Sequence, residues 1–314
     1  MKIVSFYRFF DLENPKIHCE SLQALCDENN LLGTVLLAEE GFNCTLAGNQ
    51  QSVMIVLAWL KNTFALKNPI EARWTEAAQA PFRHMRVRLK KEIVTLGRTD
   101  IKPHKSSSRY LSASDWNELI DNSNTLVIDT RNHYEVEIGS FPNSLNPGTD
   151  SFRQFPLFAE QLIKISKKQP IGMFCTGGIR CEKAAALMLE LGFQEIYQLE
   201  GGILKYLEQV TEENNRWNGE CFVFDSRVAI DCDLAEGDYI QCHACRRPLS
   251  NEDLHSPDYR EGISCPQCIS ELDEDETRRL EECQHQVHLA EMPSKTHIGA
   301  ILSNDAIKSS KKST

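Results

Sequence analysis

Apolar and polar positions change period several times along the first part of the chain. Alternation with a period of two predicts strands, and apolar positions at helical spacing predict amphipathic helices. The expected elements are a strand, a helix, two strands, a helix and further strands at residues 2–9, 14–30, 33–48, 50–64 and 82–96. This β-α-β-β-α-β order is that of a ferredoxin-like α+β domain, which we assign to residues 1–97.

The middle of the chain alternates short buried-strand runs with helical runs. The strand runs lie at residues 125–131, 170–175 and 195–203, and the helical runs at residues 115–122, 155–168 and 180–192. Such alternation is typical of a parallel sheet flanked by helices, so residues 114–212 are predicted to be an α/β domain. Ser114 or Asp115 is expected to cap its first helix, with Glu118 placed as in a capping box. The polar stretch 98–113 before it is predicted to be a linker.

Beyond residue 212 the periodic pattern ends. Residues 213–290 are rich in cysteine, and the polar residues 291–314 are predicted to be a disordered tail. No apolar run approaches the roughly 18 residues of a membrane span, and the first 16 residues lack the apolar core of a signal peptide. We therefore expect a cytoplasmic protein with no membrane partner.

Charge is unevenly distributed along the chain. The net charge of −11 argues against a globally basic nucleic-acid binder. Residues 83–109, however, contain nine Lys or Arg residues and only two acidic ones. Local patches decide binding to a polyanion, because counterion release is a short-range effect. A solvated strand and linker would explain the same charges, so both interpretations stay open.

The strand at residues 170–175 leads directly into a loop and a helix that favour a reactive thiol. Cys175 stands at the carboxyl end of the strand, where parallel sheets bind ligands. The backbone amides of the loop, the positive end of the helix dipole and the charge of Arg180 would all stabilise a thiolate. We therefore expect Cys175 to be the nucleophile and Arg180 to face either a bound anion or an acidic partner. The loop between them consists of Thr176, Gly177, Gly178 and Ile179.

The size of this loop separates two chemistries. Cysteine phosphatases have five residues between cysteine and arginine, whereas Cys175 and Arg180 are separated by four. The segment resembles the active-site loop of the rhodanese family, whose cysteine carries sulfane sulfur as a persulfide. Residues 128–146 resemble a second stretch of that family, with Ser140 in place of the usual histidine, and residues 199–203 resemble its closing Gly-Gly turn. The resemblance implies a rhodanese fold for the α/β domain.

Three nearby residues have alternative interpretations. Cys181 lies in the first turn of the predicted helix and could be a second, resolving thiol for Cys175, or it could pack inward. Asp129 and Arg131 are best interpreted as a structural ion pair that braces the end of the sheet, and a catalytic role is the alternative.

Two Cys-x-x-Cys pairs follow in the C-terminal region. Cys242 and Cys245 form the first pair, Cys265 and Cys268 form the second, and 19 residues lie between the two pairs. Each pair can supply two thiolates to one tetrahedral metal, which predicts a structural Zn²⁺ site without an open coordination position.

The flanking segments narrow the resemblance. Four segments, at residues 38–48, 82–97, 174–184 and 217–228, together resemble the bacterial rhodanese-domain tRNA uridine hydroxylases. That resemblance covers nearly the whole chain. It implies oxygen-dependent 5-hydroxylation of the wobble uridine at tRNA position 34, with O2 as co-substrate, Cys175 as the active cysteine and an electron donor of unknown identity. The sequence contains no nucleotide or flavin motif.

The implied substrate gives the basic stretch a role. It could hold the anticodon stem-loop of tRNA by its phosphates, with only half of its side chains facing the RNA if it is a strand. The candidate contacts are Arg83, Arg86, Arg88, Lys90 and Lys91. The alternative function is that of a rhodanese-type sulfurtransferase that passes sulfane sulfur through a Cys175 persulfide.

Overall fold

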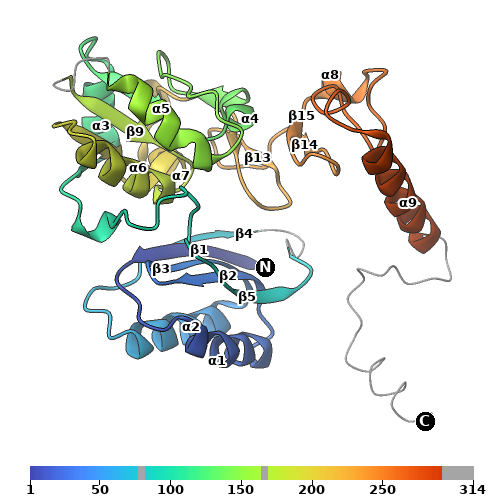
Figure 1. Ribbon diagram of the computed structural model, residues 1–314, viewed down its shortest axis with the longest axis horizontal. Coiled ribbons are helices and arrows are strands. Elements are labelled where there is room, and N and C mark those ends of the chain that lie inside the picture. Colours follow the sequence, from blue (N-terminus) through green and yellow to red (C-terminus); the bar gives the residue numbers. More distant parts are fainter. Residues whose placement is uncertain (77–81, 164–168, 292–314) are drawn as a thin grey trace.

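The structure is a computed structural model that describes residues 1–76, 82–163 and 169–291. Its N-terminal domain is an α+β sandwich in which two helices cover one face of a five-stranded sheet (Figure 1). The elements are β1 (Lys2–Phe9), α1 (Lys16–Glu28), β2 (Leu32–Ala38), β3 (Gly41–Gly48), α2 (Gln50–Thr63), β4 (Ala72–Glu76) and β5 (Met85–Leu89). The strand order β4-β1-β3-β2-β5 is the expected ferredoxin-like order with β5 added in parallel to β2.

Two expectations for this domain were wrong. No strand was expected between residues 64 and 82, but the structure has β4 there, a short strand at the sheet edge. The strands expected over residues 82–96 are a single strand, Met85–Leu89, and residues 90–97 form a connecting loop instead. Ile93 and Leu96 of this loop are fully buried against other parts of the protein, so their apolar character reflects packing between domains and not strand pairing.

The second domain contains a four-stranded parallel sheet of order β6-β10-β9-β7 with helices around it. Its strands are β6 (Arg109–Leu111), β7 (Leu126–Asp129), β8 (Gly139–Ser140), β9 (Ile171–Phe174) and β10 (Ile196–Leu199). Its helices are α3 (Ala113–Ile120), α4 (His133–Val136), α5 (Phe155–Leu162), α6 (Ile179–Glu190) and α7 (Gly202–Gln209). The predicted parallel, helix-flanked sheet is therefore confirmed.

Local differences from the sequence prediction occur at the start and end of this domain. The end of the predicted linker is β6, which pairs with β10. Ser112 caps α3, accepting a hydrogen bond from the Asp115 amide, so the cap lies two residues earlier than Ser114. Residues after 199, expected to be only a turn, continue into α7. Residues 164–168 of the helix predicted over 155–168 lie outside the described residues.

The sheet face without helices packs on the second domain, near the start of α6 (Figure 1). Lys183 of α6 is fully buried there between two carboxylates of the N-terminal part, Glu40 at 2.8 Å and Glu92. Val94 also accepts a hydrogen bond from Lys183. Removing one partner of such a buried pair would leave an uncompensated charge, which costs about 3–5 kcal/mol. These contacts fix α6 relative to the N-terminal sheet.

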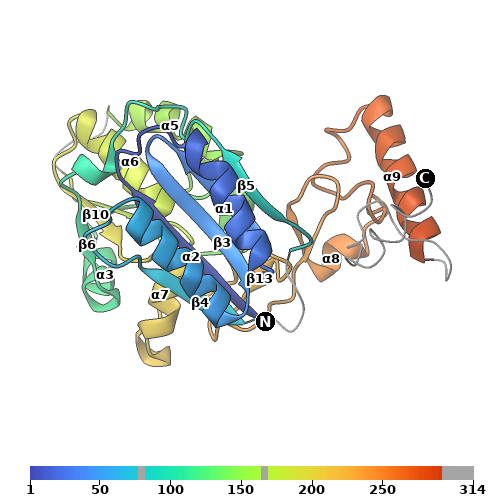
Figure 2. The ribbon, with the colours of Figure 1, turned by 90° about the horizontal axis from the view of Figure 1, so that it is seen from below.

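The C-terminal region has short strands, the short helix α8 and the longer helix α9, and its last part, with α8 and α9, extends to one side of the two domains (Figure 2). These elements are β11 (Asn218–Gly219), β12 (Cys221–Phe222), β13 (Ala229–Ile230), β14 (Ile240–Gln241), β15 (Pro248–Leu249), α8 (Asn251–Leu254) and α9 (Glu274–Glu291). The first of them pairs with β8, and Trp217, Cys221 and Ile230 pack in the core of the second domain. The predicted disordered tail lies, apart from Glu291, outside the described residues. No helix among the described residues is long and apolar enough to cross a membrane.

Candidate active site at the domain junction

The thiol loop begins where the buried strand β9 ends. Cys175 is fully buried, and Gly178 donates its backbone N–H to the sulfur at 3.1 Å. Gly178 has a φ of +93°, a conformation that glycine adopts without strain, and α6 begins at the next residue. The loop therefore curls around the sulfur and directs backbone amides toward it.

The surroundings of Cys175 favour its thiolate. Burial acts to raise its pKa, but a hydrogen bond from the Cys181 thiol, the charge of Arg180 and the backbone amides of both residues outweigh it. Together they lower the pKa of Cys175 to about 5. At neutral pH the sulfur is therefore an anion with a nucleophile's reactivity.

Arg180 is oriented by an acidic partner. Its two terminal nitrogens donate to the carboxylate of Glu135 at 2.6 and 2.8 Å, and Glu135 is fully buried. The same carboxylate accepts a hydrogen bond from the Asn132 amide at the start of α4. Of the two expected positions for Arg180, the structure has the one braced against an acid.

Cys181 is both packed and in contact with Cys175. It is fully buried, and its sulfur lies 3.4 Å from Oγ1 of Thr130. Burial, together with the neighbouring Cys175 thiolate, raises the pKa of Cys181 well above its usual range. It is therefore a neutral thiol that can donate a hydrogen bond to Cys175.

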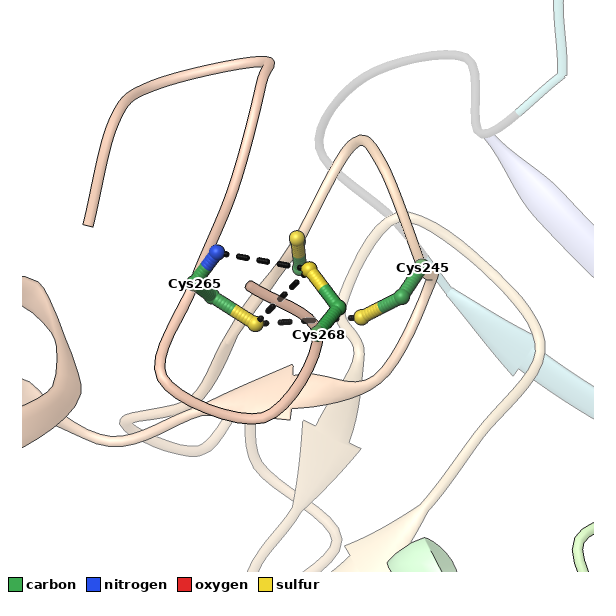
Figure 3. Close-up of side chains that lie close together, drawn as sticks. Cys245, Cys265 and Cys268 are labelled. Atoms are coloured by element: carbon green, nitrogen blue, oxygen red, sulfur yellow. Dashed lines mark hydrogen bonds between the residues drawn. The ribbon is translucent and has the colours of Figure 1, made fainter. Parts of the chain in front are cut away.

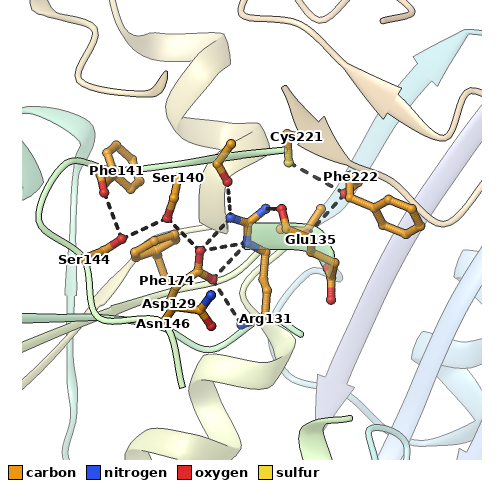
Figure 4. A network of polar contacts seen from close by, with 12 residues as sticks. Asp129, Arg131, Glu135, Ser140, Phe141, Ser144, Asn146, Phe174, Cys221 and Phe222 are labelled. Atoms are coloured by element: carbon orange, nitrogen blue, oxygen red, sulfur yellow. Dashed lines mark hydrogen bonds and ion pairs between the residues drawn. The ribbon is translucent and has the colours of Figure 1, made fainter. Parts of the chain in front are cut away.

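Asp129 and Arg131 form the predicted structural ion pair (Figure 4). Both side chains are fully buried, and Arg131 also donates to the Gly139 carbonyl at 2.6 Å. Ser140 donates its hydroxyl to Asp129 at 2.9 Å, so the serine that replaces the usual histidine still contributes a hydrogen bond to this network. The network braces the sheet end beside the thiol loop.

The N-terminal domain contributes side chains to the rim of the thiol loop. Tyr7 of β1 donates its hydroxyl to Glu182 of α6 at 2.7 Å. Arg73 of β4 donates to the Gly201 carbonyl at 3.0 Å, and its Nη1 is buried without a hydrogen-bond partner among the described residues. Burial, with the Cys175 charge nearby, raises the pKa of Glu182 to about 7. The candidate site is therefore composite and lies between the two domains.

The four cysteines of the C-terminal pairs converge on one point, and Figure 3 shows how Cys245, Cys265 and Cys268 face one another. Their sulfur atoms all lie within 4.8 Å of one another, with Cys265 3.5 Å from Cys268 and 3.8 Å from Cys245. Four sulfurs at about 2.3 Å from a tetrahedral Zn²⁺ would be roughly 3.8 Å apart. Cys242, Cys245, Cys265 and Cys268 are thus compatible with a metal such as zinc.

Two segments of the chain match known domain families. Residues 1–93 match the UPF0176 acylphosphatase-like domain, and residues 112–209 match the rhodanese-like domain. The chain has the domain architecture of the UPF0176 family. Its parallel-sheet domain is a rhodanese domain, and its N-terminal sheet is acylphosphatase-like.

Several solved structures are similar to parts of this chain. A rhodanese-related protein from Thermoplasma volcanium is 27% identical, over 32% of this chain and 92% of its own, with a TM-score of 0.26. A rhodanese-like domain from Anabaena sp. is 13% identical, over 36% and 80% of the two chains, with a TM-score of 0.30. An acylphosphatase from Coxiella burnetii is 21% identical, over 28% and 90%, with a TM-score of 0.21.

The five basic residues predicted to contact RNA lie on and beside β5, at the edge of the N-terminal sheet. Arg86 and Arg88 are exposed on β5, on the sheet face without helices, because Val87 between them faces α1 and the core. Arg83, Lys90 and Lys91 are exposed just outside the strand. All five are accessible, but only Arg86 and Arg88 share the face that leads to the site.

Sequence reasoning missed Tyr7, Arg73 and Glu182. The alternation in β1 could have placed Tyr7 on the face opposite the helices. Its contact with Glu182, 175 positions away, depends on how two domains pack, and no local pattern contains that information.

Proposed function

We propose that this chain hydroxylates C5 of the wobble uridine of tRNA, using the Cys175 loop as the reaction centre. The observation that carries the proposal is the composite site, in which the N-terminal sheet supplies Tyr7 and Arg73 to the rim of the thiol loop. A small sulfur acceptor would need only the loop itself. A polynucleotide needs an extended surface that leads to the reactive group.

Such a surface crosses the N-terminal sheet. One row of paired residues runs from Arg73 on β4 through Ser5, Thr45 and Thr34 to Arg86 on β5. The row crosses five strands, or roughly 19 Å at about 4.8 Å per strand, and ends in a cation on each side. Hydroxyl groups and guanidinium groups are suitable partners for phosphate oxygens. The row supports a path for RNA from the basic edge strand to the thiol loop.

The unpaired nitrogen of Arg73 supports the binding of an acceptor at the end of this path. A buried donor without a partner is costly, and a uracil carbonyl or a phosphate oxygen would satisfy it. Arg180 cannot easily serve this purpose, because Glu135 occupies both of its terminal nitrogens.

The overall reaction requires a reductant. The C5–H bond of uridine, O2, two electrons and two protons give the C5–OH product and one water. The Cys175 thiolate is the nucleophile available at the site. Because its sulfur is fully buried, a persulfide would carry the reactive sulfur about 2 Å further toward the rim.

The sulfurtransferase activity remains a second candidate, supported by the same thiolate. Attack of Cys175 on the outer sulfur of thiosulfate would form the persulfide and release sulfite. Backbone amides around the sulfur, as at Gly178, would stabilise the anionic product.

The test uses an RNA hairpin with the anticodon stem-loop sequence and uridine at position 34. Incubation with protein, O2 and a dithiol reductant should give 5-hydroxyuridine, measured by nucleoside mass spectrometry. Cys175→Ser should abolish the product without lowering the thermal unfolding midpoint by more than a few degrees, because serine offers no thiolate. Cys181→Ser should have a smaller effect. Product formation by Cys175→Ser at the wild-type rate would reject Cys175 as the reaction centre.

A further inference from the structure

An aromatic side chain stands exposed beside the thiol loop. Phe224 lies in the turn between β12 and β13 and is 64% exposed. The turn itself is well fixed: Asp225 accepts hydrogen bonds from the backbone and side chain of Arg227, and Val223 donates to the Val228 carbonyl at 2.9 Å. The exposure of Phe224 is therefore a property of a fixed turn.

The same turn is attached to the reaction centre. The guanidinium carbon of Arg180 lies 5.7 Å from the centre of the Phe224 ring, a cation–π distance. Thr176 of the thiol loop donates to the Phe222 carbonyl at 3.4 Å, and the rings of Phe222 and Phe224 pack edge to face with centres 5.1 Å apart. Because Glu135 fixes Arg180, and Phe222 is buried, the position of Phe224 at the loop is determined from both sides.

Two ordinary explanations for this phenylalanine fit poorly. A packing residue would bury most of its ring, and Phe224 does not. A protein-docking site usually presents a contiguous apolar patch of several hundred Å². Phe224 is instead flanked along the chain by the buried Val223 and by the charged Asp225.

A single exposed ring beside an arginine suits an unstacked nucleobase. Proteins that recognise unpaired bases stack them on aromatic side chains and on guanidinium planes. We propose that Phe224 is the stacking residue for the target pyrimidine, which would extend the stack that Arg180 and Phe224 begin. This inference rests on the proposed function, and it assigns the base to the rhodanese side of the junction, while the phosphates follow the N-terminal sheet.

The first experiment measures the kinetics of hairpin hydroxylation with Phe224→Ala, Phe224→Tyr and a matched control. Loss of the stack should raise the KM for the hairpin by about 5- to 100-fold, the usual effect of removing an aromatic stacking partner. Phe224→Tyr keeps the ring and should stay within about threefold of wild type. Leu157→Ala is the control, because Leu157 is equally exposed, at 64%, on α5, and its KM should not change.

The second experiment reports the stack directly. The fluorescence of the tryptophan in Phe224→Trp, after subtraction of the wild-type signal, should be quenched by the uridine hairpin. It should not be quenched by a hairpin of the same length with an abasic site at position 34, which keeps the phosphates but removes the base. Equal quenching by both hairpins would overturn the stacking assignment.

The two proposals fail in different ways. If wild type hydroxylates the hairpin and Phe224→Ala has an unchanged KM, the stacking assignment is wrong and the proposed function stands. If Phe224→Ala leaves that KM unchanged but slows sulfur transfer to a protein acceptor, Phe224 is a protein contact instead. If wild type neither binds nor hydroxylates the hairpin, both proposals are wrong.

Discussion

Two cysteine sites in this chain place the thiol group in opposite environments. In the thiol loop, the Gly178 amide, the Cys181 thiol and the charge of Arg180 all stabilise the thiolate of one cysteine. In the C-terminal cluster, four sulfurs surround one point and would repel one another as thiolates without a cation. A thiolate stabilised by hydrogen-bond donors keeps its nucleophilicity. A thiolate that lies beside three other cysteine sulfurs is suited to binding a metal instead.

The two sites also differ in what supports them. The thiol loop precedes α6, which is held by a full domain core and by Lys183 between two carboxylates of the N-terminal part. The cysteine cluster has only a small local core, in which Leu249 is the one fully buried aliphatic side chain among the described residues. We expect the loop to tolerate loss of its cysteine and the cluster to depend on its metal.

The largest expected effect comes from breaking the cluster. Cys242→Ser should lose the metal and unfold residues 240–272 locally, because structural zinc contributes about 10–16 kcal/mol to such small sites and the local core cannot replace it. Elemental analysis should find one zinc per wild-type chain, and hydrogen exchange should show loss of protection in that segment of the variant.

Cys232→Ser and Cys283→Ser are the matched controls for this variant. Both cysteines are exposed and lie outside the cluster, so these changes should keep the zinc. A wild-type protein without metal, in which all four cluster thiols react freely with a thiol reagent, would contradict the site.

Lowering the pH should distinguish the thiol loop from the cysteine cluster, through protonation of the Cys175 thiolate. The folded-state pKa of Cys175 is about 5, below the roughly 8.5 of a thiol in an unfolded chain. The thiolate therefore contributes stability that is fully present above about pH 8.5 and is lost as the pH falls through about 5. The rate of sulfur uptake from thiosulfate should follow the thiolate, falling about tenfold per pH unit below 5.

The measurement is that rate between pH 4 and 9, with Cys175→Ser as the blank. The charged and titratable groups that interact with the sulfur are Arg180, Cys181, Glu182, Tyr7 and Arg73. Of these, Glu182 titrates near 7, and its charge opposes the thiolate, so a modest change in rate near pH 7 is also expected. Half-maximal uptake near pH 8.5 would show that the loop does not stabilise the anion.

These two sites also show what a sequence can reveal. Both depend on local order: a strand, a four-residue loop and a helix for Cys175, and two close pairs for the cluster. The composite rim does not depend on local order. Arg73 lies on a strand that the sequence did not indicate, and Tyr7 contacts Glu182 only because the two domains pack together. Ile93 and Leu96 show the same limit, because burial between domains gave them the pattern of a strand.

The smallest expected effect concerns the basic edge strand, which the proposed function connects to the thiol loop and not to the cluster. Arg86→Gln, Arg88→Gln and Lys90→Gln together should weaken binding of the RNA hairpin. Each lost phosphate contact should reduce the slope of log affinity against log salt by about 0.7 to 0.9. Because Arg86 and Arg88 share the open sheet face, we expect them to account for most of the change.

The control for this triple variant removes the same charge from the other side of the domain. Lys16, Lys61 and Lys67 are exposed on or next to the helices α1 and α2, so their replacement by glutamine should leave the salt slope nearly unchanged. A titration from 50 to 300 mM salt with both triple variants distinguishes a specific path from general charge attraction. Equal changes in the two slopes would show that the edge strand is only a solvated surface. They would also show that the row from Arg73 to Arg86 does not bind RNA.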